Sequence, residues 1–200
     1  MSRFDQLAKD WDLNPRRVNS ALKATDKIKE IVDIKDKDIL DFGAGTGLIS
    51  FNLFEDAKTV TAMDNSQGML NELERKSKEA DIKNIKTELF DADEKKLPEN
   101  SYDLIVTAMT LHHIKDPFFF IKDAKKALKR GGYLVISDLE SEDGTFHTRG
   151  NEEVMHFGFD KEQIKEWYEK AGFEIVYLET NEIVKKHQDF NIFLAIGKYV

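Results

Sequence analysis

A glycine-rich turn is the first segment whose residue types and spacing could do chemistry. Gly43-Ala44-Gly45-Thr46-Gly47 follows the apolar run 38–42 and precedes a segment in which apolar residues have helical spacing. Glycine allows unusual backbone angles and close approach of a ligand, and the start of a helix offers unpaired backbone N–H groups. The turn is therefore expected to hold a polar cofactor.

Two carboxylates accompany this turn. Asp41 lies just before it, and Asp64 ends the strand-like run 59–63. In a doubly wound sheet, an acid at the end of the second strand lies across the crevice from the glycine turn and accepts the hydroxyl groups of a ribose. The spacing G-x-G-x-G differs from the dinucleotide fingerprint G-x-G-x-x-G, and the charge of Asp41 suits an ammonium group better than a pyrophosphate. A nicotinamide or flavin cofactor is the alternative.

Two adjacent histidines could supply a base. His112 and His113 follow the strand-like run 102–107, and open α/β sheets bind ligands beyond the carboxyl ends of their strands. An imidazole titrates near neutral pH, which suits a group that removes a proton from a substrate. The alternative is that one of the pair packs inward with Leu111 and Ile114.

A long irregular stretch, 139–159, carries two more histidines, His147 and His156. Loops of this length are usually functional or disordered, and glycines would let this one move. With Asp138 and Glu140 the two histidines could ligate a metal, but no short fixed ligand spacing supports that interpretation. The stretch is therefore expected to form an acceptor-side insertion with no metal.

Strand-like runs alternate with helical segments through the middle of the chain. The expected strands are 38–42, 59–63, 85–90, 102–107 and 133–138, and the expected helices are 46–54, 66–80 and 117–129. Such alternation favours a parallel sheet with helices on both faces. Another helix is expected to begin at Asp160, which together with Gln163 resembles a capping box.

The end of the chain breaks this alternation. The runs 173–184 and 190–199 are both strand-like, and only five residues separate them. A parallel crossover needs a dozen residues or more, so the two runs must form an antiparallel hairpin. The sequence therefore predicts an α/β fold of one domain over 1–200: a doubly wound, mostly parallel seven-stranded sheet with an antiparallel C-terminal strand.

Five segments, in order and at family spacing, resemble the class I S-adenosylmethionine-dependent methyltransferases. They are DILDFGAGTGLIS, VTAMDNSQGML, FDADEKKLP, SYDLIVTAMTLHHIKD and LKRGGYLVISDLE. Within the class, the chain is most similar to the small-molecule branch, methyltransferase type 11, which includes ubiquinone and menaquinone biosynthesis enzymes. The resemblance implies a Rossmann-like fold, S-adenosylmethionine as cofactor, and methyl transfer to a small-molecule acceptor by direct in-line displacement.

The resemblance also implies where the cofactor lies. The methionine part would meet Trp11, Asp41, Gly43, Ala44, Gly45, Gly47 and Thr107, the ribose Asp64, and the adenine Asn65, Met69, Asp91 and Ala92. Residues 1–35 resemble the helical lid that precedes the first strand in the family. The catalytic candidates are His112 and His113.

The composition excludes several classes. The chain has 200 residues, a formal net charge of −8 and no cysteine. Disulfides, thiolate metal sites and a cysteine nucleophile are therefore excluded. An acidic surface repels nucleic acid, and no apolar run is long enough to cross a membrane. We expect a cytoplasmic protein, monomeric or homodimeric. An NAD(P)-dependent oxidoreductase and a non-catalytic S-adenosylmethionine-binding protein are the alternatives.

Overall fold

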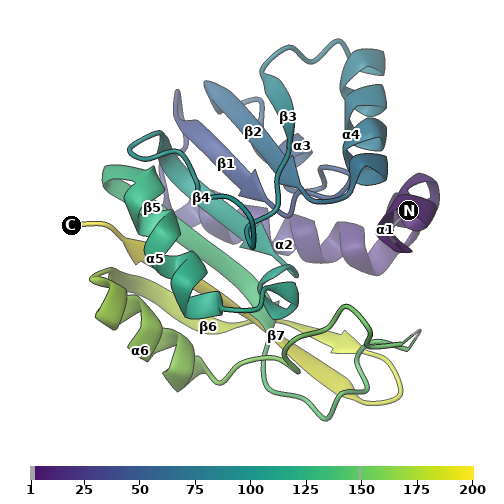
Figure 1. Ribbon diagram of the computed structural model, residues 1–200, viewed down its shortest axis with the longest axis vertical. Coiled ribbons are helices and arrows are strands. Elements are labelled where there is room, and N and C mark those ends of the chain that lie inside the picture. Colours follow the sequence, from purple (N-terminus) through teal and green to yellow (C-terminus); the bar gives the residue numbers. More distant parts are fainter. Residues whose placement is uncertain (1–2, 149) are drawn as a thin grey trace.

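The protein folds around one seven-stranded sheet, counted over the residues that the computed structural model describes, 3–148 and 150–200. The strands lie in the order β3-β2-β1-β4-β5-β7-β6, as Figure 1 shows. Their bounds are β1 Asp38–Phe42, β2 Thr59–Asp64, β3 Ile85–Leu89, β4 Tyr102–Ala108, β5 Leu128–Leu139, β6 Glu174–Lys185 and β7 Asp189–Lys198. Among the described strands, β7 alone is reversed: it pairs antiparallel with β5 and β6, whereas the other pairs are parallel, which confirms the predicted sheet.

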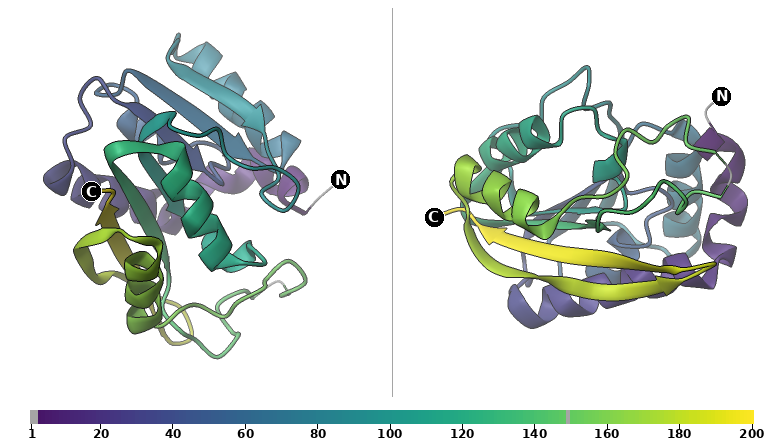
Figure 2. Two further views of the ribbon diagram at one scale, coloured as in Figure 1. Left: turned by 60° about the vertical axis from the view of Figure 1, so that its left-hand side comes forward. Right: turned by 90° about the horizontal axis from the view of Figure 1, so that it is seen from below.

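Helices cover both faces of the sheet (Figure 2). They are α1 Arg3–Leu7, α2 Pro15–Ile31, α3 Ser50–Leu53, α4 Gln67–Glu79, α5 Pro117–Ala127 and α6 Lys161–Ala171, with 3-10 helices η1 Ala8–Leu13 and η2 Leu111–His113. Apolar residues of α5 and α6, such as Ile121 and Ile164, pack in one core cluster. Those of α2 and α3, such as Ile28 and Leu53, pack in a second cluster. Burial of these stripes holds the two layers on the sheet.

Two local predictions were wrong. The helix expected from residue 46 begins only at Ser50, because Gly47 has φ +89 and extends the turn. The capping box expected at Asp160 does not form, and its carboxylate accepts from the Ser141 hydroxyl at 2.9 Å instead. In contrast, Asn14, Ser66 and Asp116 cap α2, α4 and α5 with their side chains, as their residue types favour.

The irregular segment after β5 and the N-terminal helix meet over the carboxyl edge of the parallel strands (Figure 2). The Arg3 guanidinium donates to the Gly150 carbonyl at 3.3 Å. Residues 139–159 also contact the tip of the β6–β7 hairpin, where Phe146 packs with Phe190. No helix in the described part of the chain is long and apolar enough to cross a membrane.

Candidate functional site

The glycine turn lies between the ends of β1 and β2. The N–H groups of Gly43 and Ala44 both donate to the Met63 carbonyl, at 2.8 and 2.9 Å. A Cβ at Gly43, which has φ +70, would lie 2.2 Å from the Thr110 hydroxyl. A Cβ at Gly45, which has φ +54, would have nothing within 4 Å. Gly43 therefore serves packing, whereas Gly45 faces open space that a ligand can occupy.

Asp64 reaches across to this turn. Its carboxylate accepts from the Gly45 N–H and from the Ser66 N–H, each at 2.8 Å. Burial raises the pKa of Asp64, while these backbone hydrogen bonds oppose the increase. A carboxylate offers about four lone-pair sites, so acceptor capacity is left for ligand hydroxyl groups. The structure thus brings together the two residues that the sequence pairs across the crevice.

Asp41, which is expected to face the cofactor's ammonium group directly or through water, is buried at the end of β1. It is 1% exposed, and its carboxylate accepts from the backbone N–H and hydroxyl of Ser50, at 3.0 and 2.6 Å. Burial raises its pKa to about 7, although both Ser50 hydrogen bonds favour the charged form. In this conformation Asp41 supports the turn from behind by holding the first residue of α3.

The remaining predicted cofactor residues surround the same edge. Thr107 pairs in register with Phe42, just before the turn, and is fully buried. Its hydroxyl has no hydrogen-bond partner among residues 3–148 and 150–200. Met69 is buried in α4, and Asn65 is exposed. The chain after β3 reaches Asp64, because the Phe90 N–H donates to the Asp64 carbonyl at 2.9 Å, so the partly buried Asp91 and Ala92 lie at this edge too.

The N-terminal segment covers the turn through two acids whose partners the sequence did not reveal. The Asp5 carboxylate accepts from the Ser66 hydroxyl and the Gly68 N–H, at 2.7 and 2.8 Å. The Asp12 carboxylate accepts from the Thr46 hydroxyl at 2.5 Å. These bonds fix the lid on the turn and on the start of α4. No short-range pattern could have found them, because each joins residues far apart in the chain.

Trp11 belongs to this lid. Its ring lies under the Arg17 guanidinium, 3.5 Å from the guanidinium carbon to the ring centroid, and meets the ring of Phe4 edge-on at 5.8 Å. The Arg17 side chain also donates to the Trp11 carbonyl at 3.1 Å. Trp11 is therefore held rigidly beside the site, with a cation–π contact on its ring.

The histidine pair stands at the end of β4 on a strained turn. Met109 has φ +55, a left-handed conformation that costs about 1–2 kcal/mol for a residue with a side chain. The chain then enters η2, where His112 is 1% exposed. Its Nδ1 lies 2.6 Å from the Asp138 carboxylate. Burial alone would raise the pKa of Asp138, but the charge and hydrogen bond of His112 hold it below its ordinary value.

His113 and His147 lie beside this buried pair. The rings of His112 and His113 are 4.1 Å apart between centroids, and those of His112 and His147 are 5.0 Å apart. Nδ1 of His113 lies 2.5 Å from the Glu153 carbonyl. Burial, with the neighbouring imidazoles, lowers the pKa of both His113 and His147 to about 4, so both rings are neutral near pH 7. The sequence did not predict that His147 joins the pair.

The insertion is tied to η2 by backbone bonds. The N–H groups of Met155 and His156 both donate to the His112 carbonyl, at 3.0 and 3.1 Å. Nε2 of His156 lies 3.0 Å from the Ile114 carbonyl. His156 therefore makes its own contact and stands apart from the three clustered histidines.

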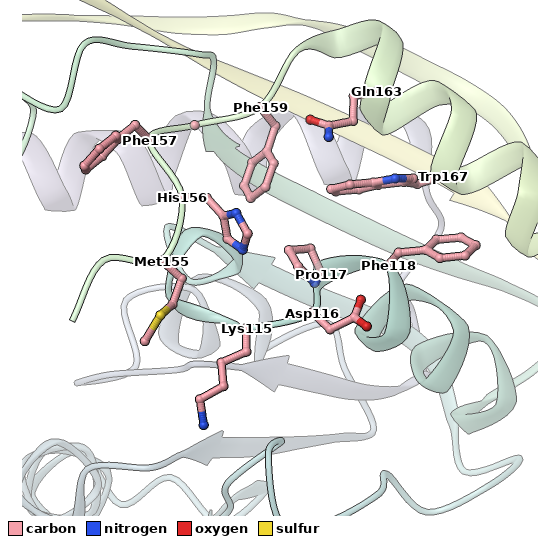
Figure 3. Close-up of a pocket in the computed structure, with 11 residues that line it drawn as sticks. Lys115, Asp116, Pro117, Phe118, Met155, His156, Phe157, Phe159, Gln163 and Trp167 are labelled. Carbon is pink, nitrogen blue, oxygen red and sulfur yellow. The ribbon is translucent and has the colours of Figure 1, made fainter. Parts of the chain in front are cut away.

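A cavity of about 510 Å³ opens between this part of the insertion, the start of α5 and α6. Figure 3 shows Trp167, Phe118 and Pro117 on one side of it and His156 on another. It adjoins the histidine cluster through the Met155–Phe159 segment rather than through the glycine turn. Aromatic side chains line part of the cavity, together with the polar residues Lys115, Asp116 and Gln163.

The donors and acceptors around the turn fit S-adenosylmethionine. The unpartnered Thr107 hydroxyl, the open side of Gly45 and the spare acceptor sites of Asp64 are what a polar, ribose-bearing ligand requires.

Comparison with known proteins identifies the family of the chain. The model of a methyltransferase domain family matches residues 16–178. The chain belongs to this family. The cofactor that this family indicates is S-adenosylmethionine.

Two relatives match the chain over part of their own length. A ubiquinone biosynthesis O-methyltransferase from Hydrogenovibrio crunogenus is 30% identical over 70% of the chain and 59% of its own length. An uncharacterized methyltransferase from Schizosaccharomyces pombe is 30% identical over 80% of the chain and 60% of its own length. The chain thus spans about 60% of the relatives it matches.

Solved structures show the same fold. A SAM-dependent methyltransferase from Aquifex aeolicus superposes with a TM-score of 0.70 at 24% identity, covering 94% of this chain and 99% of that one. A putative methyltransferase from Haloferax volcanii, solved in a complex with the Trm112 activator, has a TM-score of 0.82 at 15% identity, covering 100% and 98%.

Proposed function

We propose that this chain transfers the methyl group of S-adenosylmethionine to a hydroxyl oxygen of a small molecule. The observation that carries the proposal is the buried His112–Asp138 pair at the carboxyl edge of the sheet, next to the glycine turn. Membership of the methyltransferase domain family supports the reaction type. The O-methyltransferase relatives support oxygen as the acceptor atom.

On the cofactor side, we assign the ribose hydroxyl groups to Asp64 and the methionine part to the turn Gly43–Gly47, with Thr107 and Trp11 beside it. Asn65, Met69, Asp91 and Ala92 would surround the adenine. Asp41 acts through its hold on Ser50 and through the charge it carries when ionised. This arrangement fixes the direction in which the methyl group points.

On the acceptor side, His112 and His113 polarise the hydroxyl group that attacks. S-adenosylmethionine supplies a methyl group that is already activated on a sulfonium. The protein has to align the acceptor oxygen behind that methyl group and to exclude water, and such orientation can supply about 7–11 kcal/mol of barrier reduction. Asp138 holds the ring of His112 in one orientation, as carboxylates do for catalytic imidazoles.

The acceptor is proposed to be a small molecule with an apolar part rather than a nucleic acid. The aromatic cavity beside the insertion supports an apolar group, and the net charge of −8 disfavours a phosphate backbone. A cytoplasmic location and a monomeric or homodimeric state complete the proposal. The segment 1–35 acts as a lid, and 139–159 forms the acceptor-side wall.

Titration with labelled S-adenosylmethionine and with NADH tests the cofactor, and a panel of phenols, amines and carbon acids tests the acceptor. We expect binding of S-adenosylmethionine and methylation of a hydroxyl compound. Binding of NADH alone would favour an oxidoreductase and refute the proposal. Cofactor binding without turnover on any acceptor would point to a non-catalytic S-adenosylmethionine-binding protein.

A further inference from the structure

Three of the five histidines of the chain meet in one cluster: His112, His113 and His147. One ligand nitrogen from each lies within 4.8 Å of the other two. His112 and His113 come from the turn after β4, whereas His147 comes from the insertion. The cluster therefore joins two separate segments at the acceptor side.

Hydrogen bonds show which ring nitrogens of His112 and His113 carry a proton. A backbone carbonyl can only accept, so Nδ1 of His113 carries the proton that it donates to the Glu153 carbonyl. Nδ1 of His112 likewise donates to the Asp138 carboxylate. In the neutral ring this leaves the lone pair on Nε2 of both residues. The Asp138 carboxylate and the Glu153 carbonyl thus determine which nitrogen of each ring carries the lone pair.

Two ring nitrogens of the cluster are unpaired among residues 3–148 and 150–200. Nε2 of His112 and Nδ1 of His147 are both buried without a hydrogen bond in the described part of the chain. A buried polar atom left unpaired costs about 1–3 kcal/mol. Structural core histidines normally avoid this cost by pairing both nitrogens. The unpaired nitrogens of the cluster are instead typical of a site that binds a metal ion.

We propose that His112, His113 and His147 bind one divalent zinc-class ion. Imidazole is a preferred ligand of zinc, copper, iron and nickel, whereas magnesium and calcium prefer oxygen. With Zn–N bonds of about 2.0–2.1 Å, tetrahedral ligand nitrogens lie about 3.4 Å apart. The observed separations lie within 4.8 Å, and side-chain rotation of His147 on the insertion can close the difference.

The surroundings match those of a metal site. Metal-bound histidines almost always donate their other ring N–H to a carboxylate or a backbone carbonyl, which fixes ring orientation. Asp138 does this for His112 and the Glu153 carbonyl does it for His113. The same ion would clamp the insertion onto the end of β4, because His147 is its ligand there.

Three protein ligands leave a fourth position open, as in catalytic zinc sites. This step rests on the proposed function: the acceptor hydroxyl oxygen occupies that position. A bound cation stabilises the deprotonated oxygen, whose proton goes to solvent. The oxygen lone pair then forms the new C–O bond while the C–S bond breaks, so the products are a methyl ether and the thioether form of the cofactor. His112 then acts on the hydroxyl through the ion.

Metal binding tests the proposal directly. Protein freed of metal by chelator dialysis is titrated with Co²⁺, whose visible absorption reports coordination by nitrogen, and the Co²⁺ is then displaced by Zn²⁺. We expect one equivalent per chain. His147→Ala is expected to weaken Zn²⁺ binding by about 100-fold or more, and His113→Ala to do the same.

The other two histidines provide matched controls. His156→Ala and His187→Ala are expected to retain the wild-type stoichiometry and affinity, because both rings lie outside the cluster. A His112→Ala chain that fails to fold leaves the test intact, since His147→Ala lies in the insertion. Binding of less than about a tenth of an equivalent overturns the proposal, as does equal loss in all histidine variants. S-adenosylmethionine binding, measured in parallel, distinguishes failure here from failure of the proposed function.

Discussion

The two sides of the site are built in opposite ways. On the cofactor side, three carboxylates are already paired with the protein: Asp64 with the turn, Asp41 with Ser50, and Asp12 with Thr46. On the acceptor side, three imidazoles meet, and Nε2 of His112 and Nδ1 of His147 have no hydrogen bond within the described residues. The cofactor side is preorganised by its own hydrogen bonds. The acceptor side has ring nitrogens that are available to the proposed metal ion.

The rigid part of the site is therefore the cofactor side, and the reactive part is the acceptor side. Backbone N–H groups at a turn hold a carboxylate in one position at little entropic cost. Unpaired buried nitrogens cost stability, and proteins keep such costs mainly where function needs them. Stability changes are therefore expected from damage to the cofactor side, and losses of ligand binding or turnover from damage to the acceptor side.

The largest expected effect breaks the packing of the turn. Gly43→Ala should destabilise the fold by about 3 kcal/mol or more, because its Cβ would overlap Thr110 and its backbone angle is strained. Gly45→Ala should cost only about 1 kcal/mol through strain but should weaken S-adenosylmethionine binding. Denaturant unfolding and calorimetry measure the two effects.

Gly131→Ala is the matched control for these variants. Gly131 has φ +84 and open space around a Cβ, but lies away from the turn. It should lose as much stability as Gly45→Ala and keep full cofactor affinity. Equal cofactor loss in both variants would contradict the assignment of the open side of Gly45 to the ligand.

Asp41 gives the next largest effect, through pH. Burial raises the pKa of Asp41 from its ordinary 3.8 to about 7 in the fold, so the folded chain binds a proton that the unfolded chain has lost. The stability from this group is complete below the lower value and is lost as pH rises through about 7. Relative to Asp41→Asn, the wild type should lose about 2 kcal/mol between pH 5 and pH 7.

The same residue tests the cofactor's ammonium group. If Asp41 interacts with it, binding near pH 7 should release a proton, which calorimetry in buffers of different ionisation enthalpy detects. Parallel pH profiles for the wild type and Asp41→Asn would refute the raised pKa.

Asp138→Asn should separate the acceptor side from the cofactor side. Loss of the carboxylate that orients His112 is expected to weaken Zn²⁺ binding and turnover by about 10–100-fold, while S-adenosylmethionine affinity stays unchanged. Asp123→Asn is the control: Asp123 is also buried, and its carboxylate accepts from the Leu97 N–H at 2.8 Å rather than from a histidine. Unaltered metal affinity in Asp138→Asn would contradict the role of this pair.

Asp64→Ala is expected to weaken S-adenosylmethionine binding by about tenfold or more, because hydrogen bonds to a charged group are worth about 1.5–3 kcal/mol. The fold should remain intact. Asp38→Ala removes an acid at the opposite end of β1, where it pairs with Lys129, and should leave cofactor affinity unchanged. Calorimetry decides; equal affinities would show that the ribose lies elsewhere.

The sheet, its reversed strand near the C-terminus and the position of the glycine turn could all be predicted from the sequence. Hydrophobic period and turn residues are local properties, and the right-handed crossover of parallel strands then places Asp64 opposite Gly45. The helix start at Ser50 could not be placed, because the left-handed angle of Gly47 depends on its packing against Leu73.

The acceptor side could be predicted only in part. The pairing of His112 with Asp138 follows from adjacent strands ending at one edge, and could have been inferred from the order of β4 and β5. The position of His147 could not be predicted from the sequence, because the apolar residues of 139–159 have no regular spacing. The path of this segment depends on hydrogen bonds to η2 and to the hairpin. The geometry of a tight turn follows from its own residues, whereas the geometry of a long loop depends on the groups that it packs against.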